Sequence, residues 1–279
     1  MSTITISAAD VNKLRQQTGA GMMDCRKALM ESGGDFEKAI DYLRAKGQKV
    51  AANRSDREAK EGVVVAKSNA DGNYGIIITI SSETDFVAKN AEFIAFANEV
   101  ALLALHNMPA DIDAMKALPM ANATVGDKLL EMVGKIGEKI DIARYEQLNA
   151  DTVVAYIHGN YRIGVLVGLN QEESEAVIAA GKDVAMQIAA MNPIALDANS
   201  VSAETVEREK AIAIEQIMAE GKPAEMAEKI AAGKMNKFFK ESTLLQQAFV
   251  KDNAKTVTDY LKGVNSDLNV VSFRRVAIG

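Results

Sequence analysis

The sequence predicts an α+β protein with four parts: a three-helix module, two related units of antiparallel sheet plus helices, and an inserted antiparallel helical hairpin. Three observations support this prediction. Glycines divide the start of the chain into three short apolar stripes, a hairpin–helix–strand pattern occurs twice, and a two-helix pattern occurs only in the second copy. The predicted limits are 1–47 for the module, 48–61 for a charged linker that is in part helical in one alternative, 62–149 and 150–279 for the core units, and 201–240 for the hairpin.

The first 47 residues are predicted to form three short helices separated by glycines. Ser7 is a suitable cap for the first helix, which ends near residues 19–21, where two glycines accept backbone angles that other residues resist. A second helix is expected from about Met22 to Ser32, and the Gly33-Gly34 pair ends it. Asp35 is a suitable cap for the third helix. The apolar stripe of that helix consists of Phe36, Ala39, Ile40 and Leu43.

The remainder of the chain repeats one order of elements. Two strands are expected around the turn at residues 71–73, and two more around the turn at residues 158–160, and both turns carry the letters Gly-Asn-Tyr. An alanine-rich helix and an alternating strand follow each hairpin. The helices are expected at about 90–106 and 174–191, and the closing strands at 140–145 and 271–276. The sequence therefore predicts two copies of a three-stranded sheet with helix cover.

The second copy is longer by about 40 residues, which are predicted to form a two-helix hairpin. Apart from a narrow apolar seam, both helices are largely polar. The predicted seam consists of Val206, Ala213, Ile217, Ala227, Ile230, Ala231 and Phe238. A seam this narrow suits a free-standing hairpin as well as one that meets another chain, so both alternatives stay open.

The run SETDFVAK places a large apolar ring beside a carboxylate where a strand meets a helix. A helix that begins early, with a cap at Thr84 or Asp85, would place Phe86 on the same core face as Phe93. A later cap at Asn90 would instead leave Phe86 in a loop. The apolar pattern alone favours burial, because phenylalanine is so often buried. An exposed ring beside an acid would instead suit insertion into a partner protein.

Composition narrows the function classes. The chain has 279 residues and a net charge of −6, which argues against a general nucleic-acid binder and favours a protein partner. A single cysteine excludes an internal disulfide. No leader-type or membrane-length apolar run is present, so a soluble, cytoplasmic protein is expected.

Candidate catalytic groups are few. The run from Gly19 to Asp24 begins like a dinucleotide-binding loop, but it follows a helix and lacks the third glycine. Cys25 is in line with the apolar residues of its helix and is expected to be a core thiol. The two histidines, His106 and His158, support neither a zinc site nor a Cys-His pair. We therefore expect no cofactor, no metal and no covalent chemistry, and a structural or solvated role for a turn histidine such as His158.

Two long motifs resemble the signature segments of the bacterial elongation factor Ts family: LRQQTGAGMMDCRKAL at residues 14–29, and SETDFVAK at residues 82–89. The resemblance extends to residues 72–75, 158–167 and 201–204, and thus spans nearly the whole chain. It implies a ubiquitin-associated-like (UBA-like) N-terminal module, a core of two halves and a coiled-coil insertion. The chain stops at Gly279, so no counterpart is expected of the C-terminal helical module that some members carry.

The resemblance also implies an activity, guanine-nucleotide exchange on elongation factor Tu, the GTPase that delivers aminoacyl-tRNA to the ribosome. By this resemblance Asp85 and Phe86, flanked by Thr84 and Val87, enter the GTPase near its magnesium and phosphate site. The ring would wedge between helices while the carboxylate disturbs the hydrogen-bonded water around the ion. Such a factor is not an enzyme in the covalent sense and needs no nucleotide site of its own.

Further contacts are implied position by position. Arg15, Met22 and Met23 match the family residues that meet the nucleotide domain of the GTPase, and His158 matches a position in a second contact region. Without the resemblance, Arg15, Met22 and Met23 are explained as part of a small helical core. Two rival functions remain: a non-catalytic adaptor that uses the UBA-like module, and an enzyme that uses Cys25. The oligomeric state also stays open, with a homodimer or a 2:2 complex through the core or the hairpin as alternatives.

Overall fold

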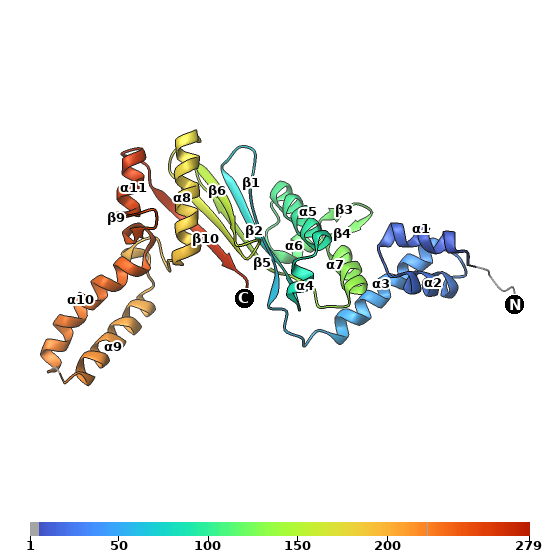
Figure 1. Ribbon diagram of the computed structural model, residues 1–279, viewed down its shortest axis with the longest axis horizontal. Helices are drawn as coiled ribbons and strands as arrows, with labels where there is room; N and C mark the ends of the chain where they lie inside the picture. The colour runs from blue at the N-terminus through green and yellow to red at the C-terminus, as the bar shows by residue number, and fades with distance from the viewer. Residues whose placement is uncertain (1–5, 222) are drawn as a thin grey trace. The chain divides into compact units, whose positions relative to one another are not determined.

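The computed structural model describes residues 6–221 and 223–279, and Figure 1 shows its helices and strands. The predicted α+β class is confirmed. The chain folds as two compact units. The first contains the chain up to Val65, together with Ile77–Tyr145 and Ala277–Gly279, and the second contains Ala66–Ile76 and Glu146–Val276. The tip of the first hairpin thus groups with the second unit.

Three N-terminal helices form as predicted: α1 (Ala8–Thr18), α2 (Met22–Glu31) and α3 (Phe36–Asn53). Ser7 caps α1 through a reciprocal capping box with Asp10, in which each side chain accepts from the backbone of the other. Gly19 ends α1 in the left-handed conformation, with φ of 66°. The core of the three helices consists of Val11, Leu14, Cys25, Ala28, Leu29 and Ala39.

Helix α3 continues six residues past the predicted end of the module, to Asn53. Gly47 does not stop it, because its backbone is needed at the contact with α7 (Val125–Ile136), where an added Cβ would lie 2.4 Å from the carbonyl oxygen of Leu130. Gly134 of α7 makes the matching close approach from the other side. The predicted linker at 48–61 is therefore helical over its first part. Figure 1 shows α3 passing beside α7.

The first sheet has the strand order β1 (Glu61–Ser68), β2 (Tyr74–Ser82), β5 (Asp141–Asn149). Every residue of the central strand β2 is buried. The single turn α4 (Asp85–Ala88) and the long helix α5 (Ala91–Asn107) follow it, and α5 buries Phe93, Phe96, Ala97, Val100, Ala101, Ala104 and Leu105. The predicted hairpin, helix and closing strand are all present.

The second sheet repeats this arrangement, with the order β6 (Thr152–His158), β7 (Ile163–Leu169), β10 (Val270–Ala277). Strands β6 and β7 are antiparallel and pair in register from Thr152–Leu169 to His158–Ile163. Helix α8 (Glu175–Met191) packs on both strands, and the shared core includes Val165, Val167, Leu169, Val184 and Ile188. The predicted second copy is thereby confirmed.

The two copies share more elements than the sequence pattern predicts: each also has a small hairpin followed by a helix. Between α5 and β5 lie α6 (Ile112–Lys116), the small hairpin β3 (Pro119–Met120) and β4 (Ala123–Thr124), and then α7. In the second copy a hairpin of β8 (Ala248–Phe249) and β9 (Asp252–Thr256) leads into α11 (Val257–Val264). The sequence Thr-Val-x-Asp marks the start of both α7 and α11, and its Thr and Asp form a capping box in each. Short 3₁₀ turns lie at Ala198–Ser200 and Leu244–Gln246.

The predicted helical hairpin is formed by α9 (Ala203–Ala219) and α10 (Ala224–Ser242), which pack against each other. Its buried seam contains Ala213, Ile217, Ala227, Ala231 and Met235. Ile230 was predicted in the seam but is exposed, because the buried positions on α10 recur at every fourth residue and Met235 continues that series. Val206 and Phe238 are half-buried.

Candidate functional site

The predicted contact residues Thr84, Asp85, Phe86 and Val87 lie in a short segment between β2 and α5, which we call the Phe86 turn (residues 83–88). Both predicted caps occur: Thr84 caps the single turn α4, and Asn90 caps α5 separately. Because α4 ends at Ala88, Phe86 and Phe93 do not share a helix face. The Phe86 side chain is 82% exposed, so the burial favoured by the apolar pattern is wrong.

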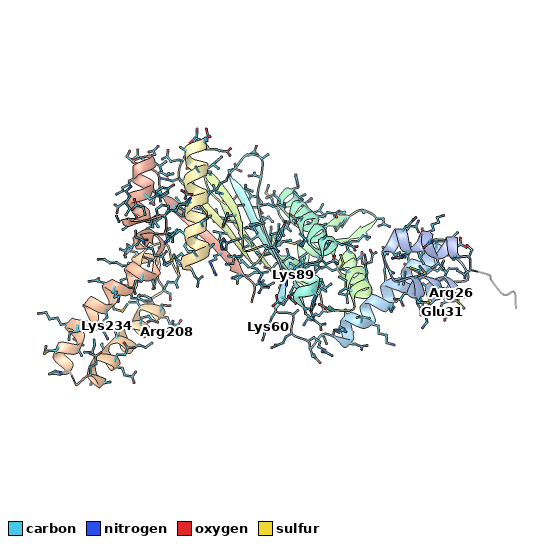
Figure 2. The ribbon with its side chains drawn as sticks, viewed as in Figure 1. Arg26, Glu31, Lys60, Lys89, Arg208 and Lys234 are labelled. Atoms are coloured by element: carbon cyan, nitrogen blue, oxygen red, sulfur yellow. The ribbon has the colours of Figure 1, made fainter. Side chains whose placement is uncertain are left out.

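Asp85 lies next to Phe86 and forms an ion pair with Lys89, with 2.6 Å between Oδ2 and Nζ. Lys89 is labelled in Figure 2. The hydrogen bond from Lys89 holds the pKa of the Asp85 carboxyl below its usual value. Both side chains are largely exposed, and such a pair adds little to stability because solvent screens it. Asp85 is therefore ionised and is free to exchange Lys89 for another partner at small cost.

Thr84 and Val87 are half-buried and have a supporting role in the geometry of the turn. The Thr84 hydroxyl donates to Glu138 at 2.7 Å, and its oxygen accepts from the Val87 amide at 3.5 Å. Glu138 was not predicted as a site residue, because it follows α7, a helix that was not predicted either. The Thr-Val-x-Asp box that begins α7 is the signal that would have located this helix.

Arg15, Met22 and Met23 lie in the same unit as the Phe86 turn, at the junction of α1 and α2. Arg15 is exposed in the last turn of α1, and Met22 and Met23 begin α2, where they are 53% and 74% exposed. The small helical core does not include them. Met30, at the other end of α2, is also 62% exposed and was not predicted as part of this surface.

His158 lies in the second unit, where it is the last residue of β6 and is exposed. Its Nδ1 is 2.9 Å from the hydroxyl of Tyr156. The next three residues, Gly159, Asn160 and Tyr161, all have positive φ, which is unusual for a bulky residue such as tyrosine. Backbone strain of this kind is costly and occurs often at functional sites, so this turn is a candidate second contact region.

Cys25 is buried in the N-terminal core, and burial raises the pKa of its thiol. Neither property suits a nucleophile, since the reactive species is an accessible thiolate. Among residues 6–221 and 223–279, no group of three or more His, Cys, Asp or Glu side chains is placed to hold a metal ion. None of the helices within these ranges combines the length and apolar character needed to cross a membrane.

The chain is similar to known proteins along its whole length. A family model described as "Elongation factor TS" matches residues 83–279, which is more than half of the chain. A protein named Elongation factor Ts from Amoebophilus asiaticus is 51% identical over 99% of this chain and all of its own length. The proteins of that name from Cytophaga hutchinsonii and Flavobacterium psychrophilum are 49% and 48% identical, over 100% and 99% of this chain and of their own lengths.

Proposed function

The chain belongs to the elongation factor Ts family, whose members are translation elongation factors, and on that premise we propose that it is a guanine-nucleotide exchange factor for elongation factor Tu. The observation that carries the proposal is the Phe86 turn. It presents an apolar ring that is 82% exposed, next to an ionised carboxylate, at the end of a fully buried strand. Large aromatic side chains are enriched among the residues that contribute most of the binding energy at protein interfaces, so an exposed ring on a fixed turn suits contact with a partner.

In the proposed mechanism Phe86 enters an apolar gap of the GTPase near its magnesium and phosphate site. Covering one phenylalanine side chain yields about 1.5–3 kcal/mol, which is available to hold the GTPase in a more open conformation. Asp85 leaves Lys89 and competes for the hydrogen bonds of the water molecules around the ion. The magnesium ion is a large part of the charge that retains the diphosphate, so weakening its contacts favours GDP release.

The mechanism requires no covalent step and no nucleotide site on this chain, and its logic is linkage. If the factor weakens GDP binding by a given ratio, GDP weakens factor binding by the same ratio. Exchange is therefore accelerated in both directions. The nucleotide present in excess in the cytoplasm, where we place this activity, then decides which nucleotide the GTPase takes up.

Two further surfaces support the proposal. The exposed side chains of Met22 and Met23 are flexible and adapt to an apolar patch, and Arg15 adds a charge beside them. We propose that they contact the nucleotide domain of the GTPase. His158, held by Tyr156 at a strained turn, is proposed to contact the GTPase from the second unit.

The test is the release of labelled GDP from elongation factor Tu, measured by stopped flow at increasing factor concentration. Wild type is expected to accelerate release. Phe86→Ala is expected to lower the saturating rate by about 10- to 100-fold, the equivalent of the lost burial. Leu102→Ala is the matched control, because Leu102 is also an exposed apolar side chain in the same unit (45%) but lies outside the Phe86 turn, and it is expected to keep the wild-type rate.

A second candidate function is a binding adaptor without exchange activity. The exposed methionines at positions 22, 23 and 30 of α2 favour it, since they would form a docking face by themselves. The same assay separates the two functions. An adaptor would bind but leave the GDP release rate unchanged at saturating concentration, and Phe86→Ala would then have no effect.

A further inference from the structure

The Phe86 turn needs support from outside itself. Helix α4 has only four residues and buries none of them, and a single helical turn is not stable alone. Residues 84–88 are exposed or half-buried, so packing against a core does not hold them. A turn that moved freely would present Phe86 and Asp85 in the required arrangement only part of the time. The hydrogen bonds to this turn therefore matter for its action on a partner.

Glu138 supplies three of these bonds. It follows Gly137, which ends α7 in the left-handed conformation with φ of 80° and so directs the chain away from the helix. Glu138 Oε2 accepts from the amides of Glu83 and Thr84, each at 3.0 Å, and Oε1 accepts from the Thr84 hydroxyl at 2.7 Å. These two amides precede α4 and have no partner within that helix. Bonds to an ionised acceptor are stronger than neutral ones.

The residues next to Thr84 and Glu138 form further hydrogen bonds, in which the acceptor belongs to the Phe86 turn and the donors lie outside it. The Glu83 carboxylate accepts from the Lys139 amide at 2.7 Å and from Arg54 Nη1 at 2.8 and 2.9 Å. The Lys139 ammonium donates to the carbonyl oxygens of Ser55 and Arg57, at 2.6 and 3.0 Å. Residues 138 and 139 thus bond both the Phe86 turn and the segment that follows α3.

We propose that Glu138 is a positioning residue for nucleotide exchange: its carboxylate holds the backbone of the Phe86 turn in the conformation in which Phe86 and Asp85 reach the GTPase together. The inference rests on the proposed function and adds to it a residue outside the SETDFVAK motif. Glu138 need not touch the GTPase. Its removal lowers the fraction of the factor that is ready to bind, and the apparent affinity falls by that fraction.

The test compares two substitutions at one position. Glu138→Ala removes all three bonds and is expected to raise the half-saturating factor concentration for GDP release by about tenfold. The saturating rate is expected to stay within about twofold of wild type, because the bound complex still contains Phe86 and Asp85. Phe86→Ala lowers the saturating rate instead. Glu138→Gln keeps an oxygen for the two amides and an NH₂ group that donates to the Thr84 oxygen, so it is expected to rescue exchange.

A second measurement reports on the turn itself. Amide hydrogen exchange at Glu83 and Thr84 is expected to accelerate at least tenfold in Glu138→Ala and to stay near wild type in Glu138→Gln. Asp127→Ala is the matched control. Asp127 also accepts from a threonine amide and hydroxyl, at 3.0 and 2.8 Å, but at the opposite end of α7. It is expected to lower the melting temperature without changing the half-saturating concentration.

The outcomes separate this inference from the proposed function. If wild type accelerates GDP release and Phe86→Ala does not, but Glu138→Ala behaves as wild type in both measurements, the positioning role is overturned and the exchange activity stands. An effect of Asp127→Ala equal to that of Glu138→Ala would also overturn it, because general destabilisation would then explain both. If wild type itself leaves GDP release unchanged, the proposed function fails first. Should Glu138→Ala not fold, Glu138→Asp is measured in its place, with the same direction expected.

Discussion

Phe86 and Phe93 are seven residues apart, yet one side chain is 82% exposed and the other is fully buried. The pattern of apolar residues treats them alike, because seven residues are close to two helical turns. The difference comes from Asn90, whose side chain accepts from the Glu92 and Phe93 amides and begins a new helix. The exposure of Phe86 agrees with the contact role that the motif resemblance implies, and periodicity alone could not predict it.

This pair gives a stability prediction. Phe86→Ala should change the free energy of unfolding by less than about 0.5 kcal/mol, since the ring has few neighbours in its own chain. Phe93→Ala should cost about 3–5 kcal/mol, because it leaves a cavity in the core. Urea unfolding followed by circular dichroism measures both values. A loss of several kcal/mol for Phe86→Ala would contradict the exposed position of the ring.

Cys25 gives a second prediction at the scale of single residues. Its side chain is fully buried, and burial raises the pKa of the thiol, so little accessible thiolate forms at neutral pH. We expect a thiol reagent such as an aromatic disulfide to label the folded protein slowly and the urea-unfolded protein at the rate of a free cysteine. Rapid labelling of the folded chain would revive the rival interpretation of Cys25 as a nucleophile.

The long helices and strands were predictable, while the short elements were not. A strand such as β3 or β8 has only two residues, too few for an alternating pattern to appear. Helix α7 was missed although its capping box is readable, and Glu138 was missed with it. Gly47 illustrates a related difficulty. A glycine late in a helix suggests a helix end, and only the presence of α7 explains why it is needed inside α3.

Substitutions of two glycines test how the helices pack. Gly47→Ala would place a Cβ 2.4 Å from the Leu130 carbonyl oxygen, a backbone atom, so α3 and α7 must separate at a cost of about 1–3 kcal/mol. Gly233 is exposed on α10, and no atom of the described residues lies within 4 Å of its added Cβ, so Gly233→Ala should stabilise the hairpin by about 0.5–1 kcal/mol.

Both glycine variants are measured by urea unfolding together with amide hydrogen exchange resolved by residue, because the Gly233 effect is local to α9 and α10. Opposite signs are expected for the two variants. A stabilising effect of Gly47→Ala would mean that the close approach of α3 to α7 is not a requirement of the fold.

At the scale of the whole molecule, stability is expected to fall at acid pH. The pKa of Asp127 is held below its usual value, chiefly by the hydrogen bond from the Thr124 amide, and that of Asp259 chiefly by the Thr256 hydroxyl. As pH falls, the unfolded chain therefore takes up these protons first. The contribution is complete above the ordinary aspartate pKa of about 3.9 and is lost below it. In the double variant Asp127→Asn/Asp259→Asn, the free energy of unfolding should depend less steeply on pH in this acid range.

At alkaline pH the free energy of unfolding is expected to fall as pH rises, because of Tyr260 in the second unit. Tyr260 stacks on Phe249 and donates its hydroxyl to Asp183 at 2.8 Å, and burial is the main reason why its pKa rises to about 12. The unfolded chain loses this proton near the usual tyrosine pKa of about 10, so stability should decline as pH rises from about 10 to 12. Tyr260→Phe should remove that part of the decline. Ultraviolet titration should show one tyrosine that ionises later than the others.

The length of helix α3 has a consequence for the proposed contacts of this chain with the GTPase. Its 18 residues correspond to a rod of about 27 Å, at about 1.5 Å per residue. The N-terminal end of α3 packs against the helices that carry Arg15, Met22 and Met23. Its C-terminal end lies next to Arg54, which donates hydrogen bonds to the Glu83 carboxylate. Helix α3 therefore fixes the separation between these two groups of residues. If Met22, Met23 and Phe86 contact one GTPase as proposed, α3 sets the distance between these contacts, and inserting one residue into α3 would rotate them by about 100° relative to each other.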